Sequence, residues 1–208
     1  MKTGTKVTTS LASPAPGRLP AGGTRCAADR LTRLAGRAIL GMPVASPEVV
    51  MVHRRRSPGL RSAAVVEVEV AAPPARVWEV LADVARWPGR TASVTSLEVL
   101  GATTLGPGAR VRIRQPRLPA MVWQVVVWRP GESFAWVTTS PGVRTLATHA
   151  VAGAGEGRST LTLGVHHHGP LAPLARLLTG RLTRRYVEME AAGHKTAAES
   201  ASARGERG

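Results

Sequence analysis

Histidine is the side chain in this sequence best suited to chemistry near neutral pH, and three of the six histidines are consecutive. His166, His167 and His168 end the segment "STLTLGVHHH", which alternates like a β-strand. Because successive strand residues point to opposite faces, His167 should continue the apolar face of Leu163 and Val165. His166 and His168 should then face water. The triplet as a whole is therefore not expected to bind one metal ion.

A fourth histidine, His149, lies on the preceding predicted strand, "RTLATHAVAG". Pairing the two strands about the loop "AGAGEG" (152–157) places His149 opposite about Leu161, five or six residues from the triplet. At about 3.3 Å per residue, that separation is well over 15 Å. Zinc ligands lie about 2 Å from the metal, so we predict no metal site.

His149 is the candidate catalytic residue. Val151 should face the core, and alternation then turns His149 inward as well. A polar residue on an apolar face usually has a hydrogen-bond partner and a structural role. The alternative is that His149 orients a carbonyl or hydroxyl group of a ligand, or transfers a proton.

Other catalytic and cofactor-binding patterns are missing from the sequence. It contains no Gly-x-Ser-x-Gly elbow and no phosphate-binding loop, so we expect no cofactor. The single cysteine, Cys26, excludes an internal disulfide and fits a reducing compartment, which favours a cytoplasmic location. No run approaches the roughly 18–20 apolar residues that span a bilayer, so no transmembrane segment is expected.

The segment "PPARVWEVLADVARWPGR" (73–90) predicts a short amphipathic helix. Pro73 and Pro74 suit the first turn of a helix, where a missing N–H costs nothing. Apolar residues then recur at helical spacing from Val77 to Val84. Pro88 should move Trp87 out of the helical region, so that the chain turns and the indole packs inward as a plug at the helix end.

Strand patterns surround this helix. Residues 65–70 alternate before it, and the segments 93–101, 110–115, 121–131, 132–140, 144–153 and 158–168 follow it. Residues 169–200 then form one long helix, with an apolar stripe made of Leu171, Leu174, Leu178, Leu182, Tyr186 and Met189. Strand, short helix, strand meander and long helix together predict an α+β fold.

The order and spacing of these pieces resemble the SRPBCC superfamily, also called START-like or helix-grip, and within it the polyketide cyclase/dehydrase and lipid-transport group. The similarity is carried by "APPARVWEVLADVARWP", "LGPGARVRIRQPRLPAMVW", "PGESFAWVTTSPGVRTLATH" and "GPLAPLARLLTGRLTRRYVEMEA", from about Ala64 to Glu199. Relatives often carry a second aromatic where this chain has Arg90. The resemblance implies a helix-grip fold, in which an antiparallel sheet wraps the C-terminal helix around an internal apolar cavity.

Strand alternation indicates which side chains would line such a cavity. Gln124 should lie on the solvent-exposed face of its strand. Alternation then turns Trp123, Val125 and Val127 inward and Trp128 outward. The expected ligand-binding residues are Val111, Ile113, Trp123, Phe134, Trp136, His149, His167 and Tyr186. The alternative for each tryptophan is an ordinary place in the core.

The resemblance and the pattern together predict three regions. Residues 1–62 carry 11 Lys and Arg against two acids and little apolar surface, so we expect a disordered basic extension. Residues 63–199 form the ligand-binding domain, and residues 200–208 a disordered tail.

The leading functional hypothesis is binding of a polyketide-like or lipid-like molecule, with or without cyclisation or dehydration. The alternatives are a non-catalytic carrier and a basic-surface protein that binds nucleic acid or an anionic membrane, since the net charge is +15. Nucleic acid is not expected as a partner, because no exposed aromatics interleave with the basic stripe "RVRIR".

Overall fold

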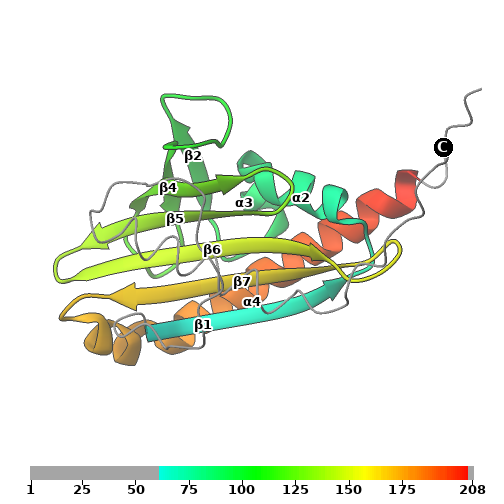
Figure 1. The fold of residues 1–208 in the computed structure, drawn as a ribbon. Helices are drawn as coiled ribbons and strands as arrows, with labels where there is room; N and C mark the ends of the chain where they lie inside the picture. Colours follow the sequence, from blue (N-terminus) through cyan, green and yellow to red (C-terminus); the bar gives the residue numbers. More distant parts are fainter. Residues whose placement is uncertain (1–60, 206–208) are drawn as a thin grey trace, which may run out of the picture.

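The computed structural model describes residues 61–205, which form one sheet and a set of helices on one side of it (Figure 1). The strands are β1 (Arg61–Val70), β2 (Ser96–Leu100), β3 (Arg110–Arg114), β4 (Met121–Arg129), β5 (Ser133–Ser140), β6 (Val143–Gly153) and β7 (Ser159–His168). The helices are α2 (Pro74–Ala82), the single turn η1 (Val84–Arg86), α3 (Trp87–Arg90) and α4 (Ala172–Gly205).

The seven strands form one antiparallel sheet in the order β1-β7-β6-β5-β4-β3-β2. The meander from β2 to β7 therefore follows the chain, and β1 closes the far edge against β7. Helix α4 runs along one face of this sheet, and α2 and α3 lie beside the C-terminal half of α4 (Figure 1). The α+β helix-grip architecture predicted from the sequence is confirmed.

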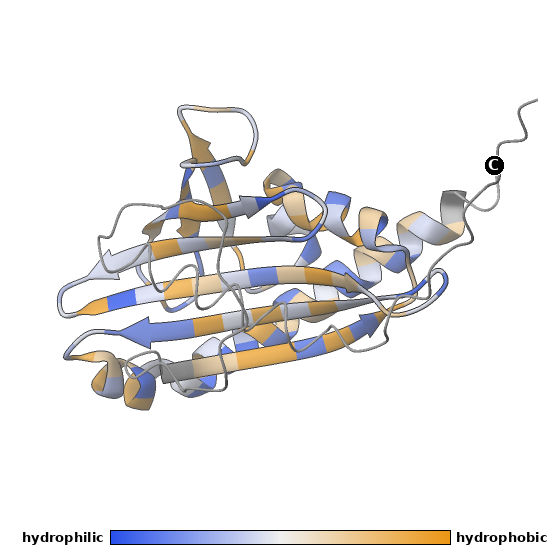
Figure 2. Ribbon diagram, in the orientation of Figure 1, coloured by the Kyte–Doolittle hydropathy of each residue, from blue (hydrophilic) through white to orange (hydrophobic). Residues whose placement is uncertain are grey.

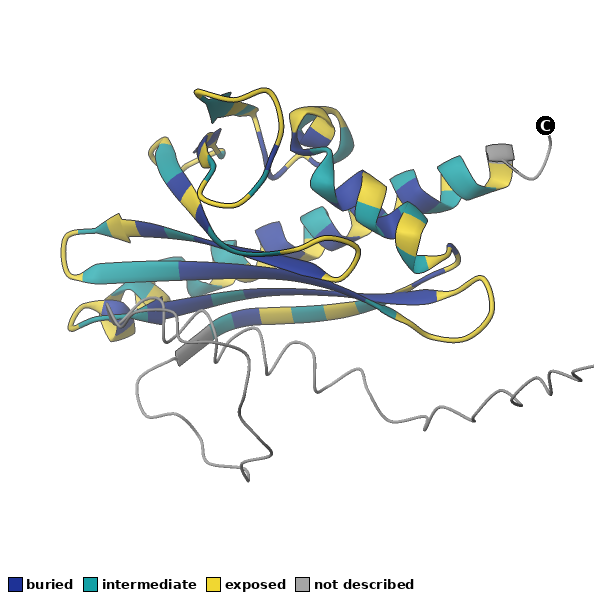
Figure 3. Ribbon diagram, turned by 45° about the horizontal axis from the view of Figure 1, so that its top comes forward, coloured by how far each residue is buried: buried dark blue, intermediate teal, exposed yellow. Residues whose placement is uncertain are grey.

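The apolar core lies between the sheet and the helices, where Figure 3 shows buried stretches on the strands and on α4. Val111 and Ile113 on β3 are buried, while Arg110, Arg112 and Arg114 of the same strand are exposed. Both results agree with the alternation read from the sequence.

Trp87 is buried at 1% exposure, and its Nε1–H donates to the carbonyl oxygen of Leu81 at 3.2 Å. The predicted inward plug is thus confirmed, but the predicted turn is wrong. Trp87 has φ −57° and ψ −42° and begins the helix α3. Pro88 is the second residue of α3, where its missing N–H would have had no acceptor within the helix.

A β-bulge changes the faces of β4. The register shifts between Val125 and Val127, so that Val127 pairs with Ala135 and Trp128 pairs with Phe134. Trp128 therefore packs against the core and Val127 lies on the opposite face, the reverse of the prediction. One inserted residue exchanges the two faces beyond it, and period-two alternation cannot anticipate that.

The apolar stripe predicted on α4 is also partly wrong. Tyr186 is buried, but Leu171, Leu174 and Leu178 are exposed. The buried positions of the C-terminal half are instead Val187, Ala191, His194 and Ala198. This helix carries apolar residues on more than one face, so spacing alone did not determine which face packs.

The domain boundaries differ slightly from the prediction. Strand β1 begins at Arg61 and α4 continues to Gly205, six residues past the expected domain end and into the expected C-terminal tail. The predicted basic extension falls almost wholly outside the described residues. Among the described helices, none is long and apolar enough to cross a membrane.

Helix α4 approaches α3 closely at Gly193. A Cβ atom built there would lie 2.3 Å from the carbonyl oxygen of Arg90, which is backbone and cannot rotate away. At Gly180, in the same helix, the nearest atom to such a Cβ is a side-chain carbon of Arg176 at an ordinary 3.6 Å.

These two glycines form a matched test of the helix contact. Gly180→Ala should raise the free energy of unfolding by about 0.5–1 kcal/mol, because alanine favours a helix interior. Gly193→Ala should lower it by roughly 1–3 kcal/mol, because α4 must move away from α3. Urea unfolding followed by circular dichroism measures both values. Stabilisation by both substitutions would mean that α4 does not rest on Arg90.

Candidate functional site

Aromatic side chains fill the centre of the space between the sheet and α4. Trp136 of β5 makes edge contacts with Trp87, Phe134 and His149, with ring centroids 5.1–5.4 Å apart, and a tilted contact with Trp123 at 6.0 Å. The structure therefore brings together four of the predicted lining residues: Trp123, Phe134, Trp136 and His149.

His149 is held inside this cluster. Its imidazole stacks on Phe134, with centroids 4.2 Å apart and planes only 10° from parallel. The residue is 3% exposed, and its place on the inner face of β6 agrees with the sequence prediction. It pairs with Leu163 rather than with Leu161, a difference of two residues that leaves the face unchanged.

The polar partner of His149 comes from α4. His149 Nε2 lies 3.1 Å from Oε1 of Glu190, whose side chain is only 13% exposed. An ionised carboxylate can only accept a hydrogen bond, so Nε2–H donates and Nδ1 carries the lone pair. That Nδ1 atom is buried and has no hydrogen-bond partner among the described residues.

A second histidine of α4 completes the constellation. His194 is fully buried, its ring lies 4.7 Å from that of Trp87, and its Nε2 is 3.9 Å from Glu190 Oε1. Neither of its ring nitrogens has a hydrogen-bond partner within the described part of the chain. Burial lowers the pKa of His194 from 6.5 to about 4, and the nearby Glu190 carboxylate only partly opposes this. His194 is therefore neutral at pH 7.

Sequence reasoning missed Glu190 and His194. They lie four residues apart on one face of α4, next to the buried Val187, Ala191 and Ala198. A stripe drawn through Val187, Glu190, Ala191, His194 and Ala198 at helical spacing would have found both. The predicted stripe through Leu178 and Leu182 follows a different face.

The other predicted lining residues lie around this cluster. Val111 and Ile113 belong to the same apolar core. The hydroxyl of Tyr186 donates to the carbonyl oxygen of Pro116, and His167 Nδ1 lies 3.0 Å from Oγ1 of Thr145. These two side chains are therefore held by other partners and make no ring contact with the aromatic cluster.

The histidine triplet differs in part from the prediction. His167 is buried on the inner face as expected, and burial lowers its pKa. His166 was expected to face water, but it is 8% exposed, and burial lowers its pKa to about 4. Its ring lies over Gly164, close to Thr148. Within residues 61–205, no three His, Cys, Asp or Glu side chains are placed to hold a metal ion.

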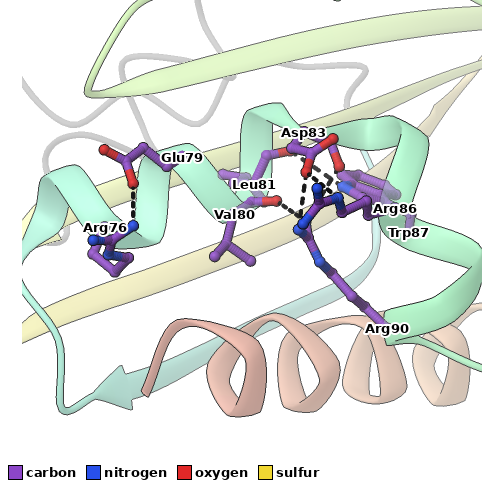
Figure 4. A network of polar contacts seen from close by, with 8 residues as sticks. All are labelled: Arg76, Glu79, Val80, Leu81, Asp83, Arg86, Trp87 and Arg90. Atoms are coloured by element: carbon purple, nitrogen blue, oxygen red, sulfur yellow. Dashed lines mark hydrogen bonds and ion pairs between the residues drawn. The ribbon is translucent and has the colours of Figure 1, made fainter. Parts of the chain in front are cut away.

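Two surface grooves of the described residues run along α2, α3 and the C-terminal half of α4. Their volumes are about 560 and 540 Å³. Figure 4 shows the polar network at the first groove, in which Arg90 joins the helices. Its guanidinium donates to the Val80 carbonyl at 2.6 Å and to the Asp83 carboxylate at 3.0 Å. These hydrogen bonds hold α3, which carries Trp87, against the end of α2.

The buried histidines make a pH prediction. Between pH 6.5 and about 4 the unfolded chain binds a proton at His194 and the folded chain does not, so stability falls as the pH falls. His194 should account for a loss of about 3 kcal/mol in the free energy of unfolding between pH 7 and pH 4. The variant His194→Leu should lack this part of the loss. The free energy of unfolding is measured at pH 7 and at pH 4 for the wild type and the variant. The difference between the two pH values is taken within each protein, so that altered packing in the variant cancels. An equal acid loss in the variant would contradict a buried neutral His194.

Comparison of the fold with solved structures gives several similar proteins at low identity. The protein TTHA0849 from Thermus thermophilus has a TM-score of 0.54 and 21% identity, over 67% of this chain and 98% of that one. The Zhui aromatase/cyclase from Streptomyces sp. R1128 has a TM-score of 0.52 and 21% identity, over 70% and 94%. Ara h 8.0201 has a TM-score of 0.52 and 13% identity, over 67% and 98%. At these identities the likeness supports the fold.

The sequence comparisons identify the family. No curated protein sequence matches the chain significantly. The profile of the family described as "Polyketide cyclase / dehydrase and lipid transport" matches residues 62–199, which include the aromatic cluster, Glu190 and His194. This chain belongs to the polyketide cyclase/dehydrase and lipid transport family of the START/SRPBCC superfamily.

Proposed function

We propose that this protein binds an aromatic or polycyclic apolar molecule at the aromatic cluster between the sheet and α4, which move apart to admit it, and that His149 acts on it as a general base. The family description supports an apolar small molecule as the ligand. The similar Streptomyces protein is an aromatase/cyclase, which supports a polyketide-like substrate class. The aromatic side chains of Trp123, Phe134 and Trp136 would contact the ligand.

The observation that carries the proposal is the polar arrangement inside this apolar site. A buried nitrogen without a partner costs about 1–3 kcal/mol, so such atoms are rare in folded proteins. Three of the four such atoms among the described residues, His149 Nδ1 and both nitrogens of His194, lie around the Trp87 and Trp136 rings. The fourth is His167 Nε2, outside this cluster. A ligand with carbonyl or hydroxyl groups would supply their missing hydrogen bonds.

The arrangement suits proton abstraction next to a carbonyl. The carboxylate of Glu190 accepts a hydrogen bond from Nε2–H, orients the ring and stabilises the imidazolium that forms when Nδ1 takes a proton. Carbon between two carbonyl groups is acidic enough for such a base. The resulting enolate would attack a second carbonyl, and protonation and loss of water from that adduct complete cyclisation and dehydration. Neutral His194 can donate a hydrogen bond to the enolate oxygen.

The first test is binding of anthrone, a neutral tricyclic ketone, followed by tryptophan fluorescence. Trp123→Leu should weaken binding by about tenfold, because a ring that contacts the ligand is lost. Trp128→Leu is the matched control, since Trp128 contacts Trp78 and Phe134 on the side of the cluster away from Trp123. Binding should depend little on salt, as expected for apolar burial. Absence of saturable binding would overturn the proposal.

The second test separates catalysis from binding. Wild-type protein should accelerate exchange of the anthrone C10 hydrogens in deuterium oxide, followed by nuclear magnetic resonance. His149→Gln should lower this rate by roughly 100-fold or more and change binding little. His167→Gln, another buried inner-face histidine, should retain the rate. Saturable binding with exchange at the buffer rate would instead support a non-catalytic carrier.

A further inference from the structure

The N-terminal half of α4 is packed on one side only, where Ala175, Thr179 and Leu182 are half-buried, and most of its other residues are exposed. Ala172 is buried, and the next buried residue of α4 is Tyr186. The 13 residues between them, 173–185, extend about 20 Å along the helix at 1.5 Å per residue. The segment therefore contacts the rest of the domain along one side and leaves its other side in solvent.

This segment exposes large apolar side chains. Five large hydrophobic residues are exposed in residues 63–203. Three of them, Leu174, Leu177 and Leu178, are in this segment, and a fourth, Leu171, directly precedes α4. Leu177 is 81% exposed and Leu178 is 73% exposed. Figure 2 shows hydrophobic and hydrophilic residues side by side on the first turns of α4, at the lower left. A contiguous apolar patch of this kind marks an interaction surface.

Arginines share the face of these leucines. Leu174, Leu178, Arg181 and Arg185 recur at i, i+4, i+7 and i+11, so they lie along one side of the helix. Residues 157–187 contain no acidic side chain at all. Arg181 and Arg185 also have no acidic partner among the described residues, whereas Arg184 pairs with Glu188 at 2.9 Å.

We propose that this surface, made of Leu171 and residues 172–185 of α4, docks onto an anionic lipid bilayer. Leucines on one face with arginines beside them are the chemistry of a helix that lies in the membrane interface. The leucines would enter the acyl boundary, while the long arginine side chains reach the phosphates. The surface lies on the N-terminal half of α4, whereas Glu190 and His194 lie on its C-terminal half, and the proposal does not depend on the ligand proposed above.

The charge of this α4 surface disfavours a second copy of the chain and residues 1–62 as its binding partner. A second copy of this chain would bring two sets of arginines together, and residues 1–62 carry a net charge of +9 that repels the same arginines. Nucleic acid would use the arginines but leave the leucines in water, since single strands bind through stacking on aromatic rings. An anionic bilayer satisfies both kinds of side chain.

The test uses the full chain and sedimentation with vesicles of phosphatidylcholine, with and without phosphatidylglycerol. Binding should require phosphatidylglycerol. Leu177→Ser with Leu178→Ser should weaken it by about tenfold or more, from lost apolar burial. Arg181→Gln with Arg185→Gln should weaken it by roughly twentyfold at low salt and less at high salt.

The matched control is Val65→Ser with Arg110→Gln, which removes an exposed apolar and an exposed basic residue from the sheet. This control should leave binding unchanged. An environment-sensitive nitrobenzoxadiazole dye on Leu177→Cys, in a Cys26→Ser background, should shift to the blue with anionic vesicles. The shift localises binding to α4 rather than to residues 1–62.

Three results would overturn the proposal. Equal binding by the leucine or arginine variants would place lipid binding elsewhere on the chain. An unshifted dye on vesicle-bound protein would show that α4 stays in water. A wild-type dimer that the leucine variant converts to a monomer, measured by sedimentation velocity, would show that a second copy covers the surface.

Discussion

The indole ring of Trp87 is the contact on which the rest of this structure depends. It lies where the sheet, α3 and α4 meet, against Trp136 on one side and His194 on the other. Its N–H bonds to the end of α2, and Arg90, three residues on, ties the same turn to Val80 and Asp83. A ring of this size sets the separation of helix and sheet, because protein interiors pack without voids. That separation determines where His149, Glu190 and His194 lie.

The cost of the candidate site is desolvation. A carboxylate and two imidazoles are kept away from water, and the depressed pKa of His194 measures part of that penalty. An apolar core of the same shape would be more stable, as is usual when a buried polar network replaces hydrophobic packing. Polar groups that are costly to the fold and poorly satisfied within it are the expected signature of a functional site.

Helix α4 divides into two halves with different roles. The C-terminal half presents Glu190 and His194 to the sheet and presses Gly193 against the backbone of α3. The N-terminal half exposes leucines and arginines and has no fully buried residue between Ala172 and Tyr186. One continuous helix links the two halves, so the proposed membrane-docking surface and the proposed ligand site belong to the same element.

The sequence by itself determined the order of the elements and the inward faces of β3, β5 and β6, because strand alternation is a local property of the backbone. Phe134, Trp136 and His149 were found in this way. The superfamily was identified from the resemblance of longer segments. Only the tertiary structure decided the rest. The bulge in β4 turned Trp128 inward, since register depends on the neighbouring strand. The partner of His149 lies 41 residues away on α4. That helix is apolar on several faces, so only packing against the sheet could select the face that carries Glu190.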